Sequence, residues 1–304
     1  MWLGVTSQTL AAEKPLIAVI TANSQPRHQD IQAVFAEYSQ AFCGSQCRIF
    51  EQAPGSDMTA LRNSIRRAVA LGADLLVTYG PAAALAAKAE SPSIPTLFAD
   101  VYDPVRLELV SAKTLTGHNM TGIRGDAPLQ ALFKYFTDAT GARKLVIVYD
   151  QTSLEGNLQR AALEDSGRKR GVAVIPLAMA TDNHMSALQE LPDDTDGLFL
   201  AINDPGDEKF AEVLKIAAQR RLPVISQCAG SAEMGAFMAL ETGVEEQGRR
   251  LAEIVGQVLA GTKADEIPLY KPRQIAFVVN LKVAREYGIP VPMQTLSLAT
   301  RIVR

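Results

Sequence analysis

The run Leu16-Ile17-Ala18-Val19-Ile20 decides the fold class of this chain. A continuous apolar run of this kind is typical of a strand buried on both faces, as in a parallel sheet covered by helices. Working outward, a helix pattern covers about 29–42, and strand-like runs begin near 48, 74 and 95. Helix patterns separate these runs, and Pro81 opens one of them at its favoured first position. The repeated βαβ order predicts a parallel sheet with helices on both faces.

The same order restarts in the second half of the chain. Strand-like runs begin near 144, 172, 196 and 223, and a helix pattern spans about 154–169. The intervals between the strands resemble those of the first half, which predicts two α/β lobes in tandem. Residues 111–125 are rich in Thr and Gly and show no clear period, so we interpret them as the link.

The C-terminal part departs from this rhythm. A helix pattern over about 244–259, with Gly261 at the position of a C-cap, and a strand at 275–279 are too little for a third domain. We therefore expect them to complete the earlier lobes, with crossovers near Gly122, between Gly230 and Gly235, and near Pro268. This division assigns 15–122 and 235–268 to lobe I, and 123–234 and 269–304 to lobe II.

Composition argues against several classes of function. The 304 residues carry a net charge of −3, so no basic excess could hold a phosphate backbone, and we expect no nucleic-acid partner. No apolar run is long enough to predict a membrane-spanning helix. The three histidines lack metal-ligand spacing with the cysteines, so we expect no metal site; they are His28, His118 and His184.

The cysteines and the N-terminus leave alternatives open. Cys43 and Cys47 would form a local disulfide in an exported protein and stay reduced in a cytosol, whereas Cys228 is interpreted as a buried small apolar residue. Leu10-Ala11-Ala12 has the small residues of a signal cleavage site, but no basic region precedes it. Residues 1–14 are therefore either the end of a signal peptide or a disordered tail.

Polar residues follow most of the predicted strands. In open parallel sheets, ligands bind beyond the carboxyl ends of the strands. Each such residue alone is typical of a helix cap or a turn, but the set as a whole predicts a ligand cleft. We expect Asp103 or Asp204 to hold a ligand donor, and Asn23, Ser153 and Asn203 to orient the ligand. The full set is Asn23, Ser24, Gly80, Pro81, Asp100, Tyr102, Asp103, Tyr149, Thr152, Ser153, Asn203, Asp204 and Gln227.

Sequence signatures of enzymes are missing. The chain has no Gly-x-Gly-x-x-Gly after a strand, no Gly-x-x-x-x-Gly-Lys-Ser/Thr loop and no Gly-x-Ser-x-Gly elbow. The acidic pairs Asp193-Asp194 and Glu245-Glu246 are expected on solvated faces rather than as general acid and base. We therefore expect no cofactor and no catalytic residue.

Three segments, in their order and spacing, resemble a known family. They are Asp103-Pro104-Val105 followed by 117–123, Tyr149 with Glu155 and Asn157 beyond it, and 280–292; Gly235-Ala236, Gly243 and Gly248 accompany them. Together they are similar to the ABC-transporter substrate-binding proteins, whose relatives include tryptophan- and tyrosine-binding members. The resemblance covers nearly the whole chain after residue 15.

The resemblance implies a periplasmic-binding-protein type 1 architecture, with two Rossmann-like lobes that close by a hinge around a small ligand. The matching cleft positions are the Asp103-Pro104 turn, the segment after Tyr149 with Asn157, and Asn203-Asp204. Departures occur at Arg106-Leu107-Glu108, at Pro81 and at Leu158. An aromatic or branched amino acid and a less polar molecule therefore both remain candidate ligands.

The predicted function is that of a monomeric, exported, periplasmic solute-binding protein that delivers its ligand to a membrane permease. A transcription regulator on the same core would need a DNA-binding head, for which the roughly 14 residues before the first strand leave no room. Two alternatives remain: a doubly wound enzyme with a cleft, and a ligand sensor for a membrane receptor.

Overall fold

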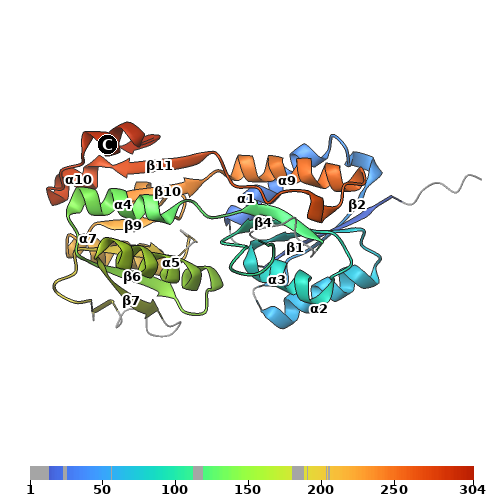
Figure 1. Ribbon diagram of the computed structural model, residues 1–304, viewed down its shortest axis with the longest axis horizontal. Coiled ribbons are helices and arrows are strands. Elements are labelled where there is room, and N and C mark those ends of the chain that lie inside the picture. The colour runs from blue at the N-terminus through green and yellow to red at the C-terminus, as the bar shows by residue number, and fades with distance from the viewer. Residues whose placement is uncertain are drawn as a thin grey trace, which may run out of the picture.

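The computed structural model describes residues 14–22, 26–55, 57–111, 119–179, 188–189, 191–202, 204 and 206–304. These residues form two α/β lobes that lie side by side, with several chain segments passing between them (Figure 1). The predicted fold class, two lobes built on mainly parallel sheets, is confirmed.

The first lobe is built on a five-stranded parallel sheet of order β2-β1-β3-β4-β5. Its strands are β1 (Leu16–Thr21), β2 (Arg48–Gln52), β3 (Leu75–Tyr79), β4 (Thr96–Val101) and β5 (Met120–Arg124). Its helices are α1 (Pro26–Ser39), α2 (Met58–Ala70), α3 (Gly80–Glu90) and α9 (Val244–Leu259), with 3-10 turns η1 (Gly44–Gln46) and η2 (Ala264–Glu266).

Alternation along β1 explains the layers of this lobe. Ile17 and Val19 pack with α1 and α9 on one face, whereas Ala18 and Ile20 pack with α2 and α3 on the other. Successive strand side chains point to opposite faces, so a continuous apolar run supplies both cores. This is the physical reason that the quoted run decides the fold.

The second lobe has a seven-stranded sheet of order β12-β11-β10-β9-β8-β6-β7, in which β10 and β11 run antiparallel. Its strands are β6 (Lys144–Asp150), β7 (Ala173–Met179), β8 (Gly197–Ala201), β9 (Val224–Ser226), β10 (Met238–Thr242), β11 (Ile275–Asn280) and β12 (Arg301–Val303). Its helices are α4 (Leu129–Thr140), α5 (Leu154–Arg170), α7 (Glu208–Gln219), α8 (Ser231–Met234), α10 (Leu281–Tyr287) and α11 (Met293–Leu298).

Three described crossovers join the lobes. The first, residues 125–128, leads from β5 to α4, and the second passes through Gly243 from β10 to α9. The third, residues 267–274, leads from η2 to β11. Tyr270 ties the third crossover to the end of the first sheet, because its N–H donates to Gly122 O at 2.9 Å and its carbonyl accepts from Arg124 N at 3.0 Å.

The sheets correct the expected lobe boundaries. The segment interpreted as a link contains β5, whose apolar pattern is interrupted by Gly122; a Cβ there would lie 2.1 Å from Phe98 O, so only glycine fits. The expected second crossover between Gly230 and Gly235 is also misplaced. Strand β10 pairs with β9 in the second sheet, so the chain crosses at Gly243 instead. Residues 238–242 give no clear strand pattern in the sequence, because the segment is short and includes a glutamate.

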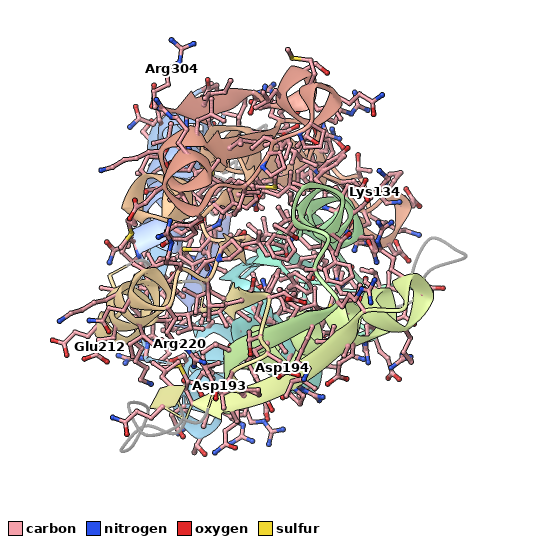
Figure 2. All side chains as sticks on the ribbon, turned by 90° about the vertical axis from the view of Figure 1, so that its left-hand side faces the viewer. Lys134, Asp193, Asp194, Glu212, Arg220 and Arg304 are labelled. Atoms are coloured by element: carbon pink, nitrogen blue, oxygen red, sulfur yellow. A yellow bond between two sulfur atoms is a disulfide. The ribbon has the colours of Figure 1, made fainter. Side chains whose placement is uncertain are left out.

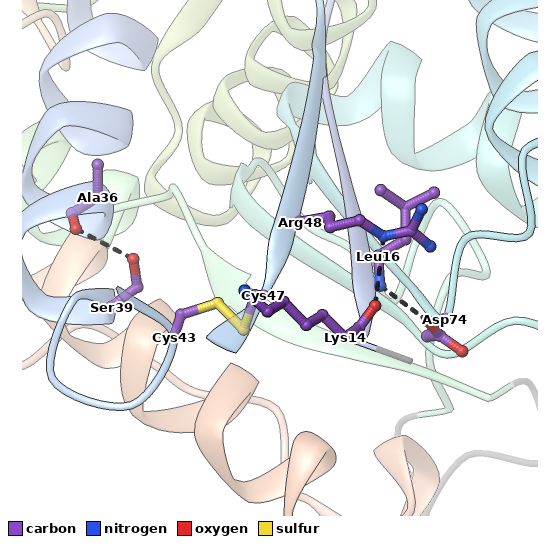
Figure 3. The surroundings of a disulfide bond; sticks show 8 residues. All are labelled: Lys14, Leu16, Ala36, Ser39, Cys43, Cys47, Arg48 and Asp74. Atoms are coloured by element: carbon purple, nitrogen blue, oxygen red, sulfur yellow. Dashed lines mark hydrogen bonds between the residues drawn. A yellow bond between two sulfur atoms is a disulfide. The ribbon is translucent and has the colours of Figure 1, made fainter. Parts of the chain in front are cut away.

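A disulfide joins Cys43 and Cys47 in the turn between α1 and β2 (Figure 3). Nearby, Leu16 N donates to Asp74 Oδ2 at 2.8 Å and Arg48 Nε donates to Lys14 O at 3.3 Å, so the start of β1 is held by its neighbours. Cys228 is a free, buried thiol, as the sequence predicts.

Two expectations concern membranes and export. Within the described ranges, none of the helices has the length and apolar character to cross a bilayer. Residues 1–13, which contain the proposed cleavage site, lie outside the described residues.

Candidate ligand-binding cleft

A cavity lies between the lobes at the carboxyl ends of both sheets. Its free space is about 20 Å³, within about 420 Å³ of space between atoms that includes the opening to solvent. The first lobe contributes the start of α1 and the end of β4, the second contributes α5 and the segment after β9, and the first two crossovers complete the wall. The lining residues are Arg27, Asp100, Tyr102, Gly125, Asp126, Ala127, Glu155, Gln159, Gln227, Cys228, Ala229, Leu240 and Thr242.

The structure brings part of the predicted set to this cavity. Asp100, Tyr102 and Gln227 line it. Asn23, Ser24 and Asn203 lie outside the described residues. The remaining predicted residues do not line the cavity; they are Gly80, Pro81, Asp103, Tyr149, Thr152, Ser153, Asn157 and Asp204.

Several of these remaining residues cap helices or close turns. Ser153 Oγ accepts from Gly156 N at 3.1 Å and caps α5. Asn157 Nδ2 donates to Gln151 O at 2.9 Å and to Ser153 O at 2.8 Å. Thr152 donates from its N–H and hydroxyl to Asp150 Oδ1, and Asp204 Oδ1 accepts from Gly206 N at 2.8 Å. Such local bonds are what Asn, Asp and Ser ordinarily make after strands.

The other four do not line the cavity and occupy structural positions. Gly80 has φ +78°, and a Cβ there would lie 2.8 Å from His28 Cε1. Pro81 lies in the first turn of α3. Asp103 has φ +43°, and its Oδ1 accepts from Arg106 N at 3.3 Å. Tyr149 lies at the end of β6 and its ring faces Arg160, with 5.6 Å between the ring centre and the guanidinium carbon.

Arg27 and Asp100 form the charged centre of the cavity wall. Arg27 Nε donates to both carboxylate oxygens of Asp100, at 2.9 and 3.1 Å. The Nε2 of His28 lies 3.3 Å from Asp100 Oδ2. Burial raises the pKa of Asp100, but the Arg27 guanidinium and the His28 N–H outweigh burial and hold that pKa well below its usual range. The carboxylate is therefore ionised, and Arg27 is held in one orientation.

Arg27 also reaches the second crossover. Its Nη1 donates to Thr242 O at 3.0 Å and its Nη2 donates to Thr242 Oγ1 at 2.6 Å. Arg27, Ala229 and Thr242 also border a second interlobe space of about 890 Å³. Arg27 and Thr242 are thus part of the wall between two spaces.

The second-lobe wall is rich in hydrogen-bonding groups. Gln227 Nε2 donates to Ala127 O at 2.7 Å, and Gln159 Nε2 donates to Gln227 Oε1 at 3.4 Å. Glu155 lies in the first turn of α5, where a carboxylate is favoured by the helix dipole. Burial raises the pKa of the Cys228 thiol to about 12, so this group is a neutral thiol.

Tyr102 supplies an aromatic wall that is almost fully buried. Burial, with the nearby Asp126 carboxylate, raises the pKa of its hydroxyl, so the phenol stays neutral. Asp126 itself accepts from Arg124 Nε at 2.8 Å. The cavity therefore combines one aromatic side chain with polar groups from both lobes.

Sequence reasoning did not single out Arg27 as a ligand residue. A signal existed, because a cation in the first turn of a helix opposes the helix dipole and calls for a partner such as Asp100. Glu155 lies in the segment after Tyr149 that carries the family resemblance, but its residue type alone gives no signal, because an acid at a helix start is ordinary in solvated helices. Gln159 has no signal of either kind.

The two acidic pairs differ from each other. Asp193 and Asp194 are exposed, pair with Arg220 and Lys144 respectively, and lie at the end of the second lobe that faces away from the first (Figure 2). Glu245 is exposed as predicted, but the prediction for Glu246 is wrong, because its side chain is buried against the third crossover.

No cluster of three or more His, Cys, Asp or Glu side chains suited to a metal ion occurs among the described residues. The polar groups of the cavity are carboxylates, amides, a guanidinium, a thiol and the two hydroxyls of Tyr102 and Thr242. This arrangement suits hydrogen bonding to a small polar organic ligand.

Comparisons with known proteins agree with this geometry. The model of a family described as ABC transporter substrate binding protein matches residues 44–303. A tyrosine-binding protein of Clostridioides difficile (strain R20291) is 23% identical over 239 residues, which cover 78% of this chain and 69% of that protein.

Solved structures share the fold. An ABC domain from Streptococcus pneumonia in complex with L-Trp has a TM-score of 0.82 at 21% identity, covering 94% of this chain and 100% of the other. A conserved domain protein from Vibrio cholerae O1 biovar El Tor strain N16961 has a TM-score of 0.83 at 20% identity, covering 95% of this chain and 100% of the other.

Proposed function

Because the chain belongs to the family of ABC transporter substrate binding proteins, we propose that it captures an amino acid between its lobes and delivers it to a membrane permease. The compound leaves the protein chemically unchanged. Closure of the lobes around it is an equilibrium, which the ligand shifts by its greater affinity for the closed form.

The observation that carries the proposal is the pairing of opposite charges across the cavity. Arg27 lies on the wall from the first lobe and Glu155 on the wall from the second. A guanidinium has five N–H donors, and the bonds to Asp100 and Thr242 use Nε–H and one N–H on each terminal nitrogen. One of the two remaining terminal N–H groups can donate to a ligand carboxylate, while Glu155 accepts from a ligand ammonium.

We further propose that the side chain of the ligand is aromatic. Tyr102 offers a buried ring, and Ala127, Ala229 and Leu240 add apolar surface to the same cavity. Aromatic rings pack well against one another in offset or edge-to-face arrangements. Similarity to a tyrosine-binding protein and to a structure holding L-Trp supports this choice over a branched side chain.

The site of action that we propose is extracytoplasmic. Family members act outside the cytoplasm, and the Cys43–Cys47 disulfide suits an oxidising compartment. We also propose that the chain works as a monomer, because each half of the cavity comes from a lobe of the same chain.

Titration calorimetry on protein freed of bound compounds by unfolding and refolding tests the function. The ligands are L-tryptophan, L-tyrosine, L-phenylalanine and L-leucine, together with tryptamine and indole-3-propionate, which lack the carboxylate and the ammonium respectively. We expect an aromatic amino acid to bind, and both indole analogues to bind at least tenfold more weakly than L-tryptophan, because each leaves one charged partner unmatched. If none of the amino acids binds, the proposal is wrong.

Glu155→Gln tests the ammonium partner. We expect affinity to fall about 10- to 100-fold, the usual effect of losing a charged hydrogen-bond acceptor. The matched control is Glu164→Gln on the same helix, which lies outside the cavity and pairs with Arg160. Equal affinities of the two variants would refute the role of Glu155.

A further inference from the structure

The hydroxyl of Thr242 lies where the second crossover leaves β10, and its bonding capacity is filled. It accepts from Arg27 Nη2 at 2.6 Å and from Gln247 Nε2 at 3.4 Å, and it donates to Gly125 O at 3.1 Å. A hydroxyl has one donor and two acceptor sites, so all three are used. The residue is buried, although it borders both interlobe spaces.

These three partners come from the first lobe and from beside two of the crossovers. Arg27 belongs to the first helix of the first lobe, Gly125 begins the first crossover, and Gln247 lies in the first turn of α9, just after the second crossover. The Thr242 side chain therefore joins the guanidinium of Arg27 to the first and second crossovers.

Asp100 closes the network from the other side. Its Oδ1 accepts from Gln247 Nε2 at 3.0 Å, and its N–H donates to Gln247 Oε1 at 2.9 Å. Gln247 is fully buried and does not line the cavity. The chain approaches closely at the same place, because a Cβ on Gly125 would lie 2.7 Å from Asp100 Oδ1.

We propose that Thr242 and Gln247 are positioning residues that couple Arg27 to the hinge, so that a carboxylate bound by Arg27 favours the closed arrangement of the lobes. This inference rests on the proposed function. Hinge motion changes the backbone angles of the crossovers. The network fixes the first and second crossovers relative to the guanidinium of Arg27. Ligand held by Arg27 thereby restricts the same segments that closure must fix.

The test compares Thr242→Val with Thr242→Ser, which keeps the hydroxyl. The remote control is Thr140→Val, whose hydroxyl donates to Phe136 O in α4 and accepts from Ala142 N just after that helix. We expect Thr242→Val to weaken the binding of L-tryptophan or L-tyrosine at least tenfold, and Thr242→Ser and Thr140→Val to stay within about threefold of the unchanged protein. Gln247→Met should also weaken binding, and because Gln247 does not line the cavity, a lost ligand contact cannot explain that result.

Solution X-ray scattering measures how far the protein contracts when ligand binds, a quantity that a purely structural role of Thr242 would not change. At saturating ligand, we expect the contraction of the unchanged protein and of Thr242→Ser to be larger than that of Thr242→Val, since the coupling to closure is lost. Full contraction of Thr242→Val at saturation would overturn the inference, as would affinity equal to that of Thr242→Ser.

A ligand-free measurement separates this inference from the proposed function. In hydrogen exchange, peptides covering 125–128 and 243–247 should exchange at least tenfold faster in Thr242→Val than in Thr242→Ser. If no amino acid binds the unchanged protein, the proposed function fails and the exchange result alone decides whether Thr242 holds the hinge. Equal exchange in the two variants overturns the positioning role whatever the ligand is.

Discussion

Replacing Glu246 with glutamine should loosen the third crossover. The buried carboxylate of Glu246 accepts from Tyr270 Oη at 2.8 Å, from Arg273 N at 3.0 and 3.1 Å, and from Gln274 N at 2.8 Å. It thereby fixes the segment between η2 and β11 against the first turn of α9. Glu246→Gln keeps the shape of the side chain but removes the charge and one of the two accepting oxygens.

The magnitude follows from the number of donors left without a partner. A hydrogen bond to a charged group contributes about 1.5–3 kcal/mol, and the new NH₂ group faces a backbone N–H that can no longer be satisfied. We take about 2 kcal/mol as the local cost, because the contributions of neighbouring bonds are not additive. That cost corresponds to about a 30-fold faster opening of the segment.

Hydrogen exchange measured by mass spectrometry on peptides covering 270–274 gives the readout. The matched control is Glu245→Gln, one residue away, whose exposed carboxylate bonds to Tyr38 Oη at 2.8 Å. We expect about 30-fold faster exchange in Glu246→Gln and less than threefold change in the control. Equal exchange in the two variants would refute the reasoning.

The same carboxylate should give an acid-dependent contribution to stability. Burial raises the pKa of Glu246, but the backbone N–H of Gln274, the hydroxyl of Tyr270 and the N–H of Arg273 outweigh burial and lower it overall. A lowered pKa stabilises the fold above the unfolded value of about 4.3 and loses that contribution as pH falls through the folded value. Urea unfolding should therefore show a smaller loss of stability between pH 6 and pH 3.5 in Glu246→Gln than in the unchanged protein, and equal losses would count against it.

Three further outcomes are expected. Gly122→Ala should lower the free energy of urea unfolding by about 2 kcal/mol or more, because its Cβ would meet the β4 backbone at 2.1 Å, whereas Gly243→Ala, with no contact under 3.8 Å, should change it by much less. Cys228 should resist iodoacetamide at pH 8 in the folded protein and gain one adduct, seen by mass, after unfolding, because burial raises its pKa to about 12. Reducing the Cys43–Cys47 bond should lower the unfolding free energy by about 2 kcal/mol, the chain-entropy effect for so short a loop.

The parts of the fold that the sequence predicts are those with continuous apolar runs. Helix α9 matches its predicted range, and β1 and β3 lie where their apolar runs predict them. The sequence does not reveal strand β5, because Gly122 and the neighbouring threonine dilute its apolar pattern, although the glycine is needed for close contact with β4. The sequence does not reveal strand β10 because Glu241 interrupts the apolar pattern. That carboxylate accepts from the N–H of Gly230 and from Arg301, which lies 60 residues away in the chain.

The sequence predicts where the candidate site lies, but not most of the residues that line it. Placing it beyond the carboxyl ends of the strands brought Asp100, Tyr102 and Gln227 to the cavity. Most other residues after strands bond to their own turn, as Ser153 does, and local sequence cannot distinguish a cap from a ligand contact. The place of Arg27 in the first turn of α1 signals the need for a partner, but its partners come from β4 and β10 and depend on tertiary contacts.

The first turn of α9 explains why the crossovers act together. Successive helical residues point about 100° apart, so Glu246 faces the third crossover while Gln247 faces Asp100 and the hydroxyl at the second crossover. The dipole at the N-terminus of α9 also favours the carboxylate of Glu246. A substitution in this turn should therefore alter how the two lobes move toward each other, without touching the ligand. Gln257→Ala, at an exposed position in the last turn of α9, should leave the hinge unchanged, because that residue lies about three turns from the second crossover.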